Sequence, residues 1–307
     1  MPEPPRPAGR ESDLEAVDIS TRGTLTQGKS RALTELSPED VVRACEENYI
    51  EYWRCVGSSA NARYSEDGGV VMCATGLPQD LFNVVLRSTL DRSQVNQRVD
   101  EVLRYFKARG LPGIWHVGPS TEPRDLGETL TARGFPHDYD LTAMAVELGP
   151  VDWSWTNSSR VQVRRVSTKR DCADWVACLT SSWESPKEAA PWMLENACFN
   201  LSHEAMGKRH LHRRKYLGFL EGKPAGTSML VWDKDIAGLQ TIGTIKEAQR
   251  NGVGTAVILA ALKDAKDMGF KFVVVLSTIE GLKLYRNLGF QEYGKLPEHG
   301  IHFEHGQ

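Results

Sequence analysis

The run from Gly238 to Thr278 constrains the fold of this 307-residue chain more than any other part of its sequence. It opens with GLQTIGTI, which reads as a strand, and passes through a glycine-rich turn into NGVGTAVILAALKDAKDMG, which has the pattern of a strong helix. The following segment, KFVVVLST, is almost continuously apolar, which is typical of a strand buried on both faces. We therefore expect an α/β layer in which strand, helix and strand follow one another.

The turn at residues 249–255, QRNGVGT, can bind an anion. The first N–H groups of a helix lack partners inside the helix, and the helix dipole adds positive charge at that end. Gly252 and Gly254 leave the backbone accessible to a phosphate, and Arg250 and Thr255 can add direct contacts. The alternative is that the glycines only make a tight turn. The spacing fits neither a Walker loop nor a complete dinucleotide fingerprint.

The rest of the second half is predicted to alternate between strands and helices. We expect a strand at 161–167, helices at 169–183 and 191–206, and a two-stranded hairpin at 214–233. A helix at 280–290, ended by Gly289, and two edge strands within 291–304 are expected to follow. The polar segment VDWSWTNSSR before them has no helical period. It separates two complete patterns, and we interpret it as a linker.

The first half is predicted to hold a comparable set of elements. We expect a capped helix at 37–57, a hairpin at 62–75 and a second helix at 91–110. A short strand at 112–118, a third helix at 120–134 and a final strand at 138–148 are expected to follow. One unit occurs in both halves: a strand, then a Ser-Thr pair, then a helix that ends in Gly-Phe. Its pairs are Ser120-Thr121 and Gly134-Phe135 in the first half, and Ser277-Thr278 and Gly289-Phe290 in the second. Such an echo is expected of duplicated domains, although one match can also arise by chance.

Composition excludes several classes of protein. The net charge of −3 provides no strong basic field for nucleic acid, so we expect no such partner. No apolar run approaches the ~20 residues that span a bilayer, and the Pro-rich start has no apolar signal segment. We therefore expect a cytoplasmic protein with no membrane partner and a disordered leader over residues 1–30.

The cysteines and histidines show no spacing that predicts a metal site. The six cysteines are scattered and are expected to be reduced, mostly buried thiols: Cys45, Cys55, Cys73, Cys172, Cys178 and Cys198. His203, His210 and His212 are only loosely clustered. No bound metal is therefore predicted.

The second half resembles the GNAT superfamily, the GCN5-related N-acetyltransferases. Gln249-x-x-Gly252-x-Gly254 is similar to the pyrophosphate motif of that superfamily. VVVLSTIEGLKLYRNLGF, with Tyr285, then resembles its later strand–helix motif at the expected distance. The resemblance covers roughly residues 161–303.

The first half resembles the degenerate N-terminal domain of tandem GNAT proteins. GIWHVGPSTEPRDLGETLTARGF followed by AMAVEL carries this likeness, and no glycine-rich phosphate motif occurs before residue 150. The resemblance implies a mixed α/β fold of two tandem GNAT-type domains, each with a mostly antiparallel sheet flanked by helices. The predicted domains are the degenerate one at 31–150 and an acyl-CoA-binding one at 151–307.

The resemblance also implies where the co-substrate, acetyl-CoA or another acyl-CoA, would bind. The pantetheine arm would lie between GLQTIGTI and KFVVVLST, with the diphosphate on the glycine turn. The implied binding residues are Thr244, Ile245, Gln249, Arg250, Asn251, Gly252, Val253, Gly254 and Thr255. Tyr285 matches the position that commonly protonates the leaving thiolate, although a core aromatic is the alternative.

The general base and the acceptor pocket are not fixed by the sequence. The strand before the turn lacks the glutamate of many relatives, and Lys246 replaces their usual proline. Candidate bases are a water chain or one of four side chains that are otherwise expected at the surface: Glu184, His203, Glu204 and Glu247. Trp183, Trp192 and Trp232 fit either the acceptor pocket or the core.

The function implied by the resemblance is N-acyl transfer. An acetyl group would pass from acetyl-CoA to a small-molecule or peptidyl amine by direct attack in a ternary complex, in a monomer or homodimer. The alternatives are other acyl-CoA chemistry on the same fold, such as decarboxylation or O-acylation, and a non-catalytic CoA-binding module. An oxidoreductase that binds a dinucleotide is a more distant alternative.

Overall fold

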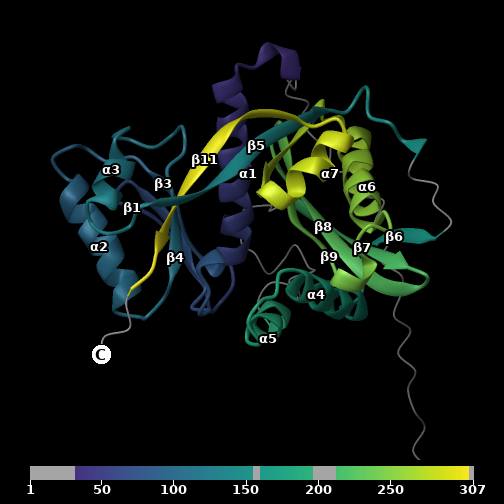
Figure 1. Ribbon diagram of the computed structural model, residues 1–307, viewed down its shortest axis with the longest axis horizontal. Helices are drawn as coiled ribbons and strands as arrows, with labels where there is room; N and C mark the ends of the chain where they lie inside the picture. Colours follow the sequence, from purple (N-terminus) through teal and green to yellow (C-terminus); the bar gives the residue numbers. More distant parts are fainter. Residues whose placement is uncertain (1–31, 155–159, 196–211, 304–307) are drawn as a thin grey trace, which may run out of the picture.

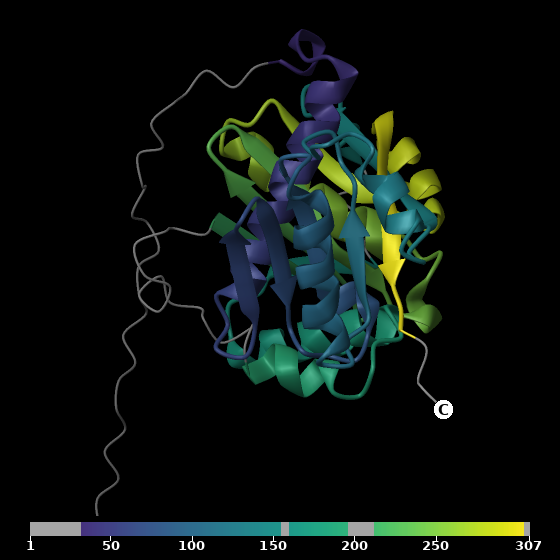
Figure 2. The same cartoon turned by 90° about the vertical axis from the view of Figure 1, so that its left-hand side faces the viewer.

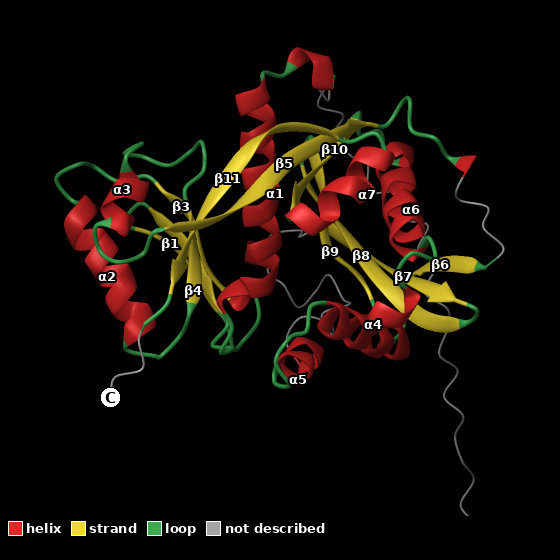
Figure 3. Cartoon of the chain, in the orientation of Figure 1, coloured by secondary structure: helices red, strands yellow, loops and turns green. Residues whose placement is uncertain are grey.

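The computed structural model describes residues 32–154, 160–195 and 212–303, and their strands form one mixed sheet. Eleven strands follow the order β1-β2-β3-β4-β11-β5-β10-β9-β8-β7-β6, and the sheet runs from one side of the molecule to the other (Figure 1 and Figure 3). The strands are β1 Arg63–Asp67, β2 Val70–Ala74, β3 Asn83–Ser88, β4 Gly113–His116, β5 His137–Glu147, β6 Val161–Arg165, β7 His212–Leu220, β8 Lys223–Asp233, β9 Ile236–Thr244, β10 Phe272–Ser277 and β11 Gln291–Ile301.

The sheet repeats one topology in its two halves. Strands β1 to β3 form an antiparallel meander, and β3 then pairs with β4 in parallel. Strands β6 to β9 form the second meander, and β9 pairs with β10 in parallel. A helix joins each parallel pair, as the geometry of a parallel crossover requires: α2 (Val95–Lys107) in the first half and α6 (Val253–Asp267) in the second. This repeat is the architecture expected of two GNAT-type domains.

The last strand of each half lies in the middle of the sheet. Strand β5 ends the first half but pairs with β10 of the second, while β11 ends the second half and pairs with β4 of the first. The two also pair with each other. The prediction that the tail forms two edge strands was therefore wrong. The tail is one 11-residue strand with a neighbour on each side, and it buries Leu296 and Ile301.

Helices cover both faces of this sheet. The remaining α-helices are α1 Pro38–Gly57, α3 Leu126–Thr131, α4 Lys169–Ser182, α5 Ala189–Met193 and α7 Leu282–Asn287. Short 3-10 helices are η1 Leu33–Glu35, η2 Asp80–Phe82, η6 Lys246–Ala248 and η7 Ile279–Gly281. Figure 2 shows α2 over the strands of the first half. Alternate residues of those strands face α2 and α1, as Val85 and Val84 do, so the two helices pack on opposite faces.

Helix α1 ties the two halves together. Its start is a capping box in which the Ser37 hydroxyl accepts from the Asp40 N–H at 3.1 Å and the Asp40 carboxylate accepts from the Ser37 N–H. The helix then crosses the junction of the sheet, where Val41 and Cys45 pack against Val274 of β10 and its neighbours. A helix from the first half of the chain thereby packs against strands of the second half.

The echo noted in the sequence is a shared helix ending. Gly134 has a φ of +86° and Gly289 a φ of +90°, a conformation that glycine adopts without strain. The Phe135 N–H donates to the Leu130 carbonyl, and the Phe290 N–H donates to the Tyr285 carbonyl in the same way. The structure thus supports duplication, with leucine in the first half where the second has Tyr285.

Three other details of the sequence prediction need correction. Helix α3 begins at Leu126, not at residues 120–121, because the backbone at Glu122 still bonds to the sheet through Ser88 and Leu90. Strand β3 was not predicted. Helix α5 ends at Met193, and residues 196–206 of the predicted helix lie outside the described part of the chain.

The predicted mixed α/β fold with a repeated topology is confirmed. The leader, residues 1–30, lies outside the described residues, and the domain boundary at 150 stays a prediction. Five cysteines are free and buried as expected, while Cys198 lies outside the described residues. Within residues 32–154, 160–195 and 212–303, no helix has the length and apolar character needed to cross a membrane.

Candidate functional site

A cleft of about 1010 Å³ opens where β9 and β10 diverge. These parallel strands share one register pair, Val274 with Gly238, and separate toward their carboxyl ends. Leu239 to Thr244 line one side of the opening, and Leu276 to Thr278 line the other. A gap between splayed parallel strands leaves backbone groups accessible to an extended ligand.

The glycine turn forms one end of this cleft. Arg250 has a φ of +62° and Gly252 a φ of +82°, and Gly252 is the N-cap of the 15-residue helix α6. A Cβ added at Gly252 meets no atom within 4 Å, so glycine is required there for the left-handed conformation rather than for space. At Gly254 a Cβ would lie 3.2 Å from Leu284 Cδ2, so any larger residue would push that side chain by a few tenths of an ångström.

Most residues predicted to bind the co-substrate are brought together at this end. Seven of them line the cleft: Thr244, Gln249, Arg250, Gly252, Val253, Gly254 and Thr255. The other two do not line it. Ile245 packs into apolar clusters, and the Asn251 amide donates to the Gln249 carbonyl at 3.0 Å, which holds the turn together. A binding role for any of these residues stays a prediction.

Positive charge gathers where the cleft opens on the turn. Arg250 and Lys283 are both exposed and line the cleft, and among the described residues neither has an ion-pair partner. Glu280, also exposed, is the one carboxylate among the described residues that lines the cleft. The first turn of α6 contains no acidic side chain. The helix dipole and these two cations therefore act in the same direction and favour an anion at the turn.

Tyr285 lies deep in the cleft. It is 5% exposed, packs edge-on against Phe290, and its hydroxyl has no hydrogen bond to a described residue. Burial raises the pKa of Tyr285 well above its usual value, because the phenolate would lose its hydration. The hydroxyl therefore stays protonated at neutral pH, as a proton donor requires.

A β-bulge shapes the middle of the cleft. The register between β8 and β9 shifts so that Ser228 faces both Thr241 and Ile242. Thr241 has a φ of +51°, which is rare for a β-branched residue, and its buried hydroxyl has no hydrogen-bond partner among the described residues. Trp183 Nε1 donates to the Ile242 carbonyl at 3.1 Å. A strained residue with an unused hydroxyl at the centre of a cleft is a typical functional feature.

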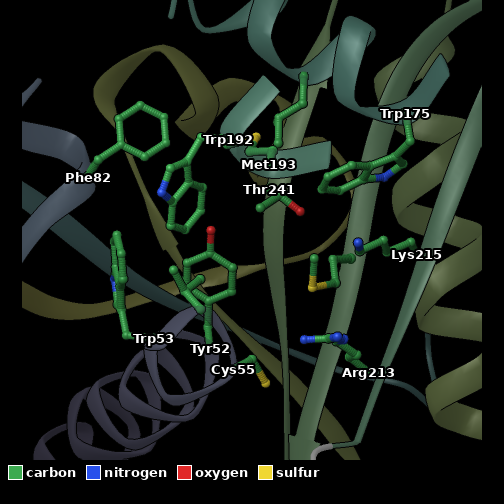
Figure 4. A pocket seen from close by; sticks show the side chains of 13 residues that line it. Tyr52, Trp53, Cys55, Phe82, Trp175, Trp192, Met193, Arg213, Lys215 and Thr241 are labelled. Atoms are coloured by element: carbon green, nitrogen blue, oxygen red, sulfur yellow. The ribbon is translucent and has the colours of Figure 1, made fainter. Parts of the chain in front are cut away.

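A second, inner pocket adjoins the cleft and shares Tyr52, Trp53, Phe82 and Thr241 with it. Figure 4 shows its lining, which is mainly aromatic and aliphatic. Its other residues are Cys55, Val56, Trp175, Leu179, Trp192, Met193, Arg213, Lys215 and Met229. The sequence had not singled out most of these residues, since those from α1 and η2 lie far from the glycine turn along the chain.

The alternatives left open by the sequence are partly decided. Trp183 lines the cleft and Trp192 the inner pocket, whereas Trp232 belongs to the core of the second half. Among the candidate bases, Glu184 and Glu247 are exposed and line neither space. His203 and Glu204 lie outside the described residues, as does His210 of the loose histidine cluster, while His212 stacks on Trp232.

Comparison with known proteins agrees with this architecture. The family model of the Acetyltransferase (GNAT) family matches residues 174–290, which contain both the glycine turn and Tyr285. Among curated protein sequences no relative matches the chain.

Solved structures share the fold over most of the chain. A GCN5-related N-acetyltransferase from Kribbella flavida has a TM-score of 0.60 at 15% identity, over 82% of this chain and 94% of that chain. A tandem GNAT protein from the clavulanic acid biosynthesis pathway has a TM-score of 0.55 at 12% identity, over 86% and 96%. A GCN5-related N-acetyltransferase from Sphaerobacter thermophilus has a TM-score of 0.54 at 12% identity, over 87% and 95%.

The fold and the cleft therefore define a tandem GNAT architecture with one glycine turn, in the second half. Residues 174–290 match the acetyltransferase (GNAT) family, and the chain as a whole shares the fold of tandem GNAT proteins.

Proposed function

We propose that this protein transfers an acyl group, most simply acetyl, from acyl-CoA to an amine within a ternary complex. The observation that carries the proposal is the position of the glycine turn. It places the N-terminus of α6, together with Arg250, at one end of a cleft that has Tyr285 in its interior. The match of residues 174–290 to the acetyltransferase (GNAT) family supports the use of an acyl-CoA.

The residues of the cleft fit the parts of an acyl-CoA. The N–H groups from Arg250 to Thr255 and the two nearby cations suit a diphosphate. The diverging strands β9 and β10 suit the extended pantetheine arm, because backbone groups on their facing edges can bond its amides. The thioester would then lie near Thr241 and Tyr285.

The reaction forms one C–N bond and breaks one C–S bond. A neutral amine attacks the thioester carbonyl, and the CoA sulfur leaves as a thiolate. Tyr285 supplies a proton to that sulfur, and the amine nitrogen releases its extra proton to solvent or to a base. The Thr241 hydroxyl, which lines the cleft and has no partner among the described residues, would donate to the carbonyl oxygen as negative charge develops on it.

A pair of variants at Gly252 tests the phosphate cradle. Asparagine and aspartate have nearly the same shape, and both tolerate a positive φ better than other side chains do. Gly252→Asn is expected to weaken acetyl-CoA binding modestly. Gly252→Asp is expected to weaken it by about tenfold or more beyond that, because the carboxylate faces the diphosphate. Isothermal titration calorimetry with acetyl-CoA measures both, with circular dichroism as the folding control.

The comparison within this pair separates charge from backbone strain. Equal loss in both variants would mean that the turn only shapes the chain, and would remove the phosphate cradle from the proposal. No binding of acetyl-CoA by the wild-type protein would overturn the proposed function itself.

One observation favours a second candidate, other acyl-CoA chemistry on the same scaffold. No carboxylate among the described residues lines the inner pocket, and an attacking amine normally needs a base. Mass spectrometry of the products decides between the two. A stoichiometric acylated amine supports N-acyl transfer, whereas free acid, an ester or a decarboxylated acyl-CoA supports the second candidate.

A further inference from the structure

The inner pocket combines an aromatic lining with two positive charges. Arg213 and Lys215 are the only charged residues among the described ones that line it. Both come from β7, two positions apart, so their side chains lie on the same face of the strand. Further along that face, Leu217 and Phe219 are buried in the apolar cluster beneath α4 and α5. Along this face of β7, the side chains are therefore apolar beneath the helices and cationic at the pocket.

Both cations are directed at the pocket interior. Figure 4 shows the Lys215 amine below Trp175, pointing toward Thr241, and the Arg213 guanidinium pointing toward the side of the pocket formed by Tyr52 and Cys55. Lys215 is 9% exposed, and its Nζ lies 4.8 Å from the centre of the Trp175 ring. Both side chains line the pocket and also interact with neighbouring residues.

We infer that the acceptor is an aromatic or similarly flat apolar amine that also carries a carboxylate, as an aromatic amino acid does, and that Arg213 and Lys215 hold this carboxylate. The inference rests on the proposed function and specifies its acceptor. Tyr52, Trp53 and Phe82, which line both the cleft and the inner pocket, suit the flat apolar part. The inner pocket itself encloses about 40 Å³, which admits a carboxylate but not an aromatic ring. The guanidinium fork and the ammonium suit the carboxylate, since charge-assisted hydrogen bonds of this kind are strong. Thr241, which lines both spaces, marks where the amine would meet the thioester.

The same two charges explain how an amine could react in a pocket whose described lining has no carboxylate. A cation close to an ammonium group lowers its pKa, because like charges repel and the neutral form is favoured. The acceptor carboxylate pairs with one of the two cations, and the other cation favours loss of a proton from the nearby amine. An amine without an anionic group gains only the repulsion, so the pocket discriminates against it.

A binding experiment tests the inference without any catalysis. The matched pair of ligands is 3-phenylpropionate and 3-phenyl-1-propanol, which differ in the carboxylate. Quenching of tryptophan fluorescence is a suitable signal, because three tryptophans line the pocket. Wild type is expected to bind the acid about 10- to 100-fold more tightly than the alcohol, the range for a charge-assisted hydrogen bond. Lys215→Met and Arg213→Met should each reduce that ratio, and Lys215→Arg should retain most of it.

Equal affinity of wild type for acid and alcohol would overturn the inference without reference to any variant. A preference for the acid that survives both methionine variants would also overturn it, since the carboxylate would then be held elsewhere. Circular dichroism confirms that each variant is folded before its ratio is interpreted.

Turnover completes the test and separates it from the proposed function. Wild type with acetyl-CoA is expected to acetylate phenylalanine at least about tenfold more efficiently, as kcat/KM, than 2-phenylethylamine. Lys215→Met should reduce kcat/KM for phenylalanine far more than for 2-phenylethylamine. Acetylation of 2-phenylethylamine but not of phenylalanine would support the proposed function and overturn this inference. Failure to bind acetyl-CoA would overturn the proposed function, while the binding ratio would still test the pocket.

Discussion

At the scale of single residues, the cleft brings together functional side chains that the sequence predicted and others that it did not. Tyr285 was expected from the motif and lies inside the cleft. Thr241 was not expected, since nothing in GLQTIGTI indicates that a bulge will give its threonine a positive φ. The bulge depends on pairing with β8, and such pairing is decided by neighbouring strands rather than by local sequence.

Replacing Tyr285 by phenylalanine tests the proton donor. Tyr285→Phe is expected to lower kcat by about 100-fold or more, because the thiolate would leave without a positioned proton. The dissociation constant of acetyl-CoA should change little, since the ring remains. Release of the CoA thiol, followed with a thiol reagent, measures kcat, and calorimetry measures binding.

The pH profile gives this prediction a second readout. Because burial raises the pKa of Tyr285, wild-type activity should show no decline from loss of this proton up to about pH 10. An unchanged kcat in Tyr285→Phe would contradict the proposed role and leave Tyr285 as a core aromatic.

At the scale of elements, α1 is fixed to the second half by a buried amide. Asn48 Nδ2 donates to the Val231 carbonyl at 2.9 Å, and Asn48 Oδ1 accepts from Gln240 Nε2 at 2.9 Å. Gly238 of β9 makes room for it, since a Cβ there would lie 2.2 Å from Asn48 Oδ1. This contact holds α1, which carries Tyr49, Tyr52 and Trp53, against the strand that lines the cleft.

A double-mutant cycle tests this contact. Asn48→Ala is expected to lower the free energy of unfolding by about 2 to 3 kcal/mol, because it leaves two buried groups without partners. Gly238→Ala is expected to cost about 1 to 3 kcal/mol, because the amide is held by two hydrogen bonds and cannot move freely. The added methyl should cost less in the Asn48→Ala background, by about 1 kcal/mol or more.

Urea denaturation measures all four proteins of the cycle. Strict additivity of the two substitutions would contradict the contact. Ser37→Ala, at the distant cap of the same helix, is a matched control and should be additive with Gly238→Ala.

At the scale of the whole molecule, the exchange of β5 and β11 makes one sheet of two repeats. Strand β5 contacts β10, and β11 contacts β4, so each half contains a strand that completes the other. Helix α1 adds contacts across the same junction. The predicted boundary near residue 150 therefore separates two parts of the sequence whose strands belong to one continuous sheet.

Separated halves are expected to fail to fold alone. A fragment of residues 160–303 lacks β5 and α1, so it would expose one edge of β10 and the apolar face beneath α1. It should show no cooperative thermal transition, whereas co-expression with residues 32–150 should restore one. Circular dichroism and tryptophan fluorescence are expected to report a single shared transition for the intact chain. A cooperative transition in the fragment alone, with binding of acetyl-CoA, would establish 160–303 as an independent domain.

Much of the local structure could be predicted because its causes are local. Caps such as Ser37, glycines with positive φ such as Gly134 and Gly289, and the helical period of 253–267 act over a few residues, and each was found where the sequence placed it. The glycine turn belongs to the same class, since a helix N-terminus forms from the residues beside it. Motif order then extended these local features to a tandem GNAT fold.

Most helices, most strands and the turn at 249–255 follow from local sequence, because hydrogen bonds within a few residues and the periodicity of apolar side chains specify them. The pairing of the tail in the middle of the sheet and the position of α1 beside the cleft were visible only in the folded chain. The same holds for Arg213 and Lys215, which face an aromatic pocket. Those arrangements depend on contacts between residues more than a hundred positions apart, and the free energy that selects them comes from burial and pairing across the assembled sheet.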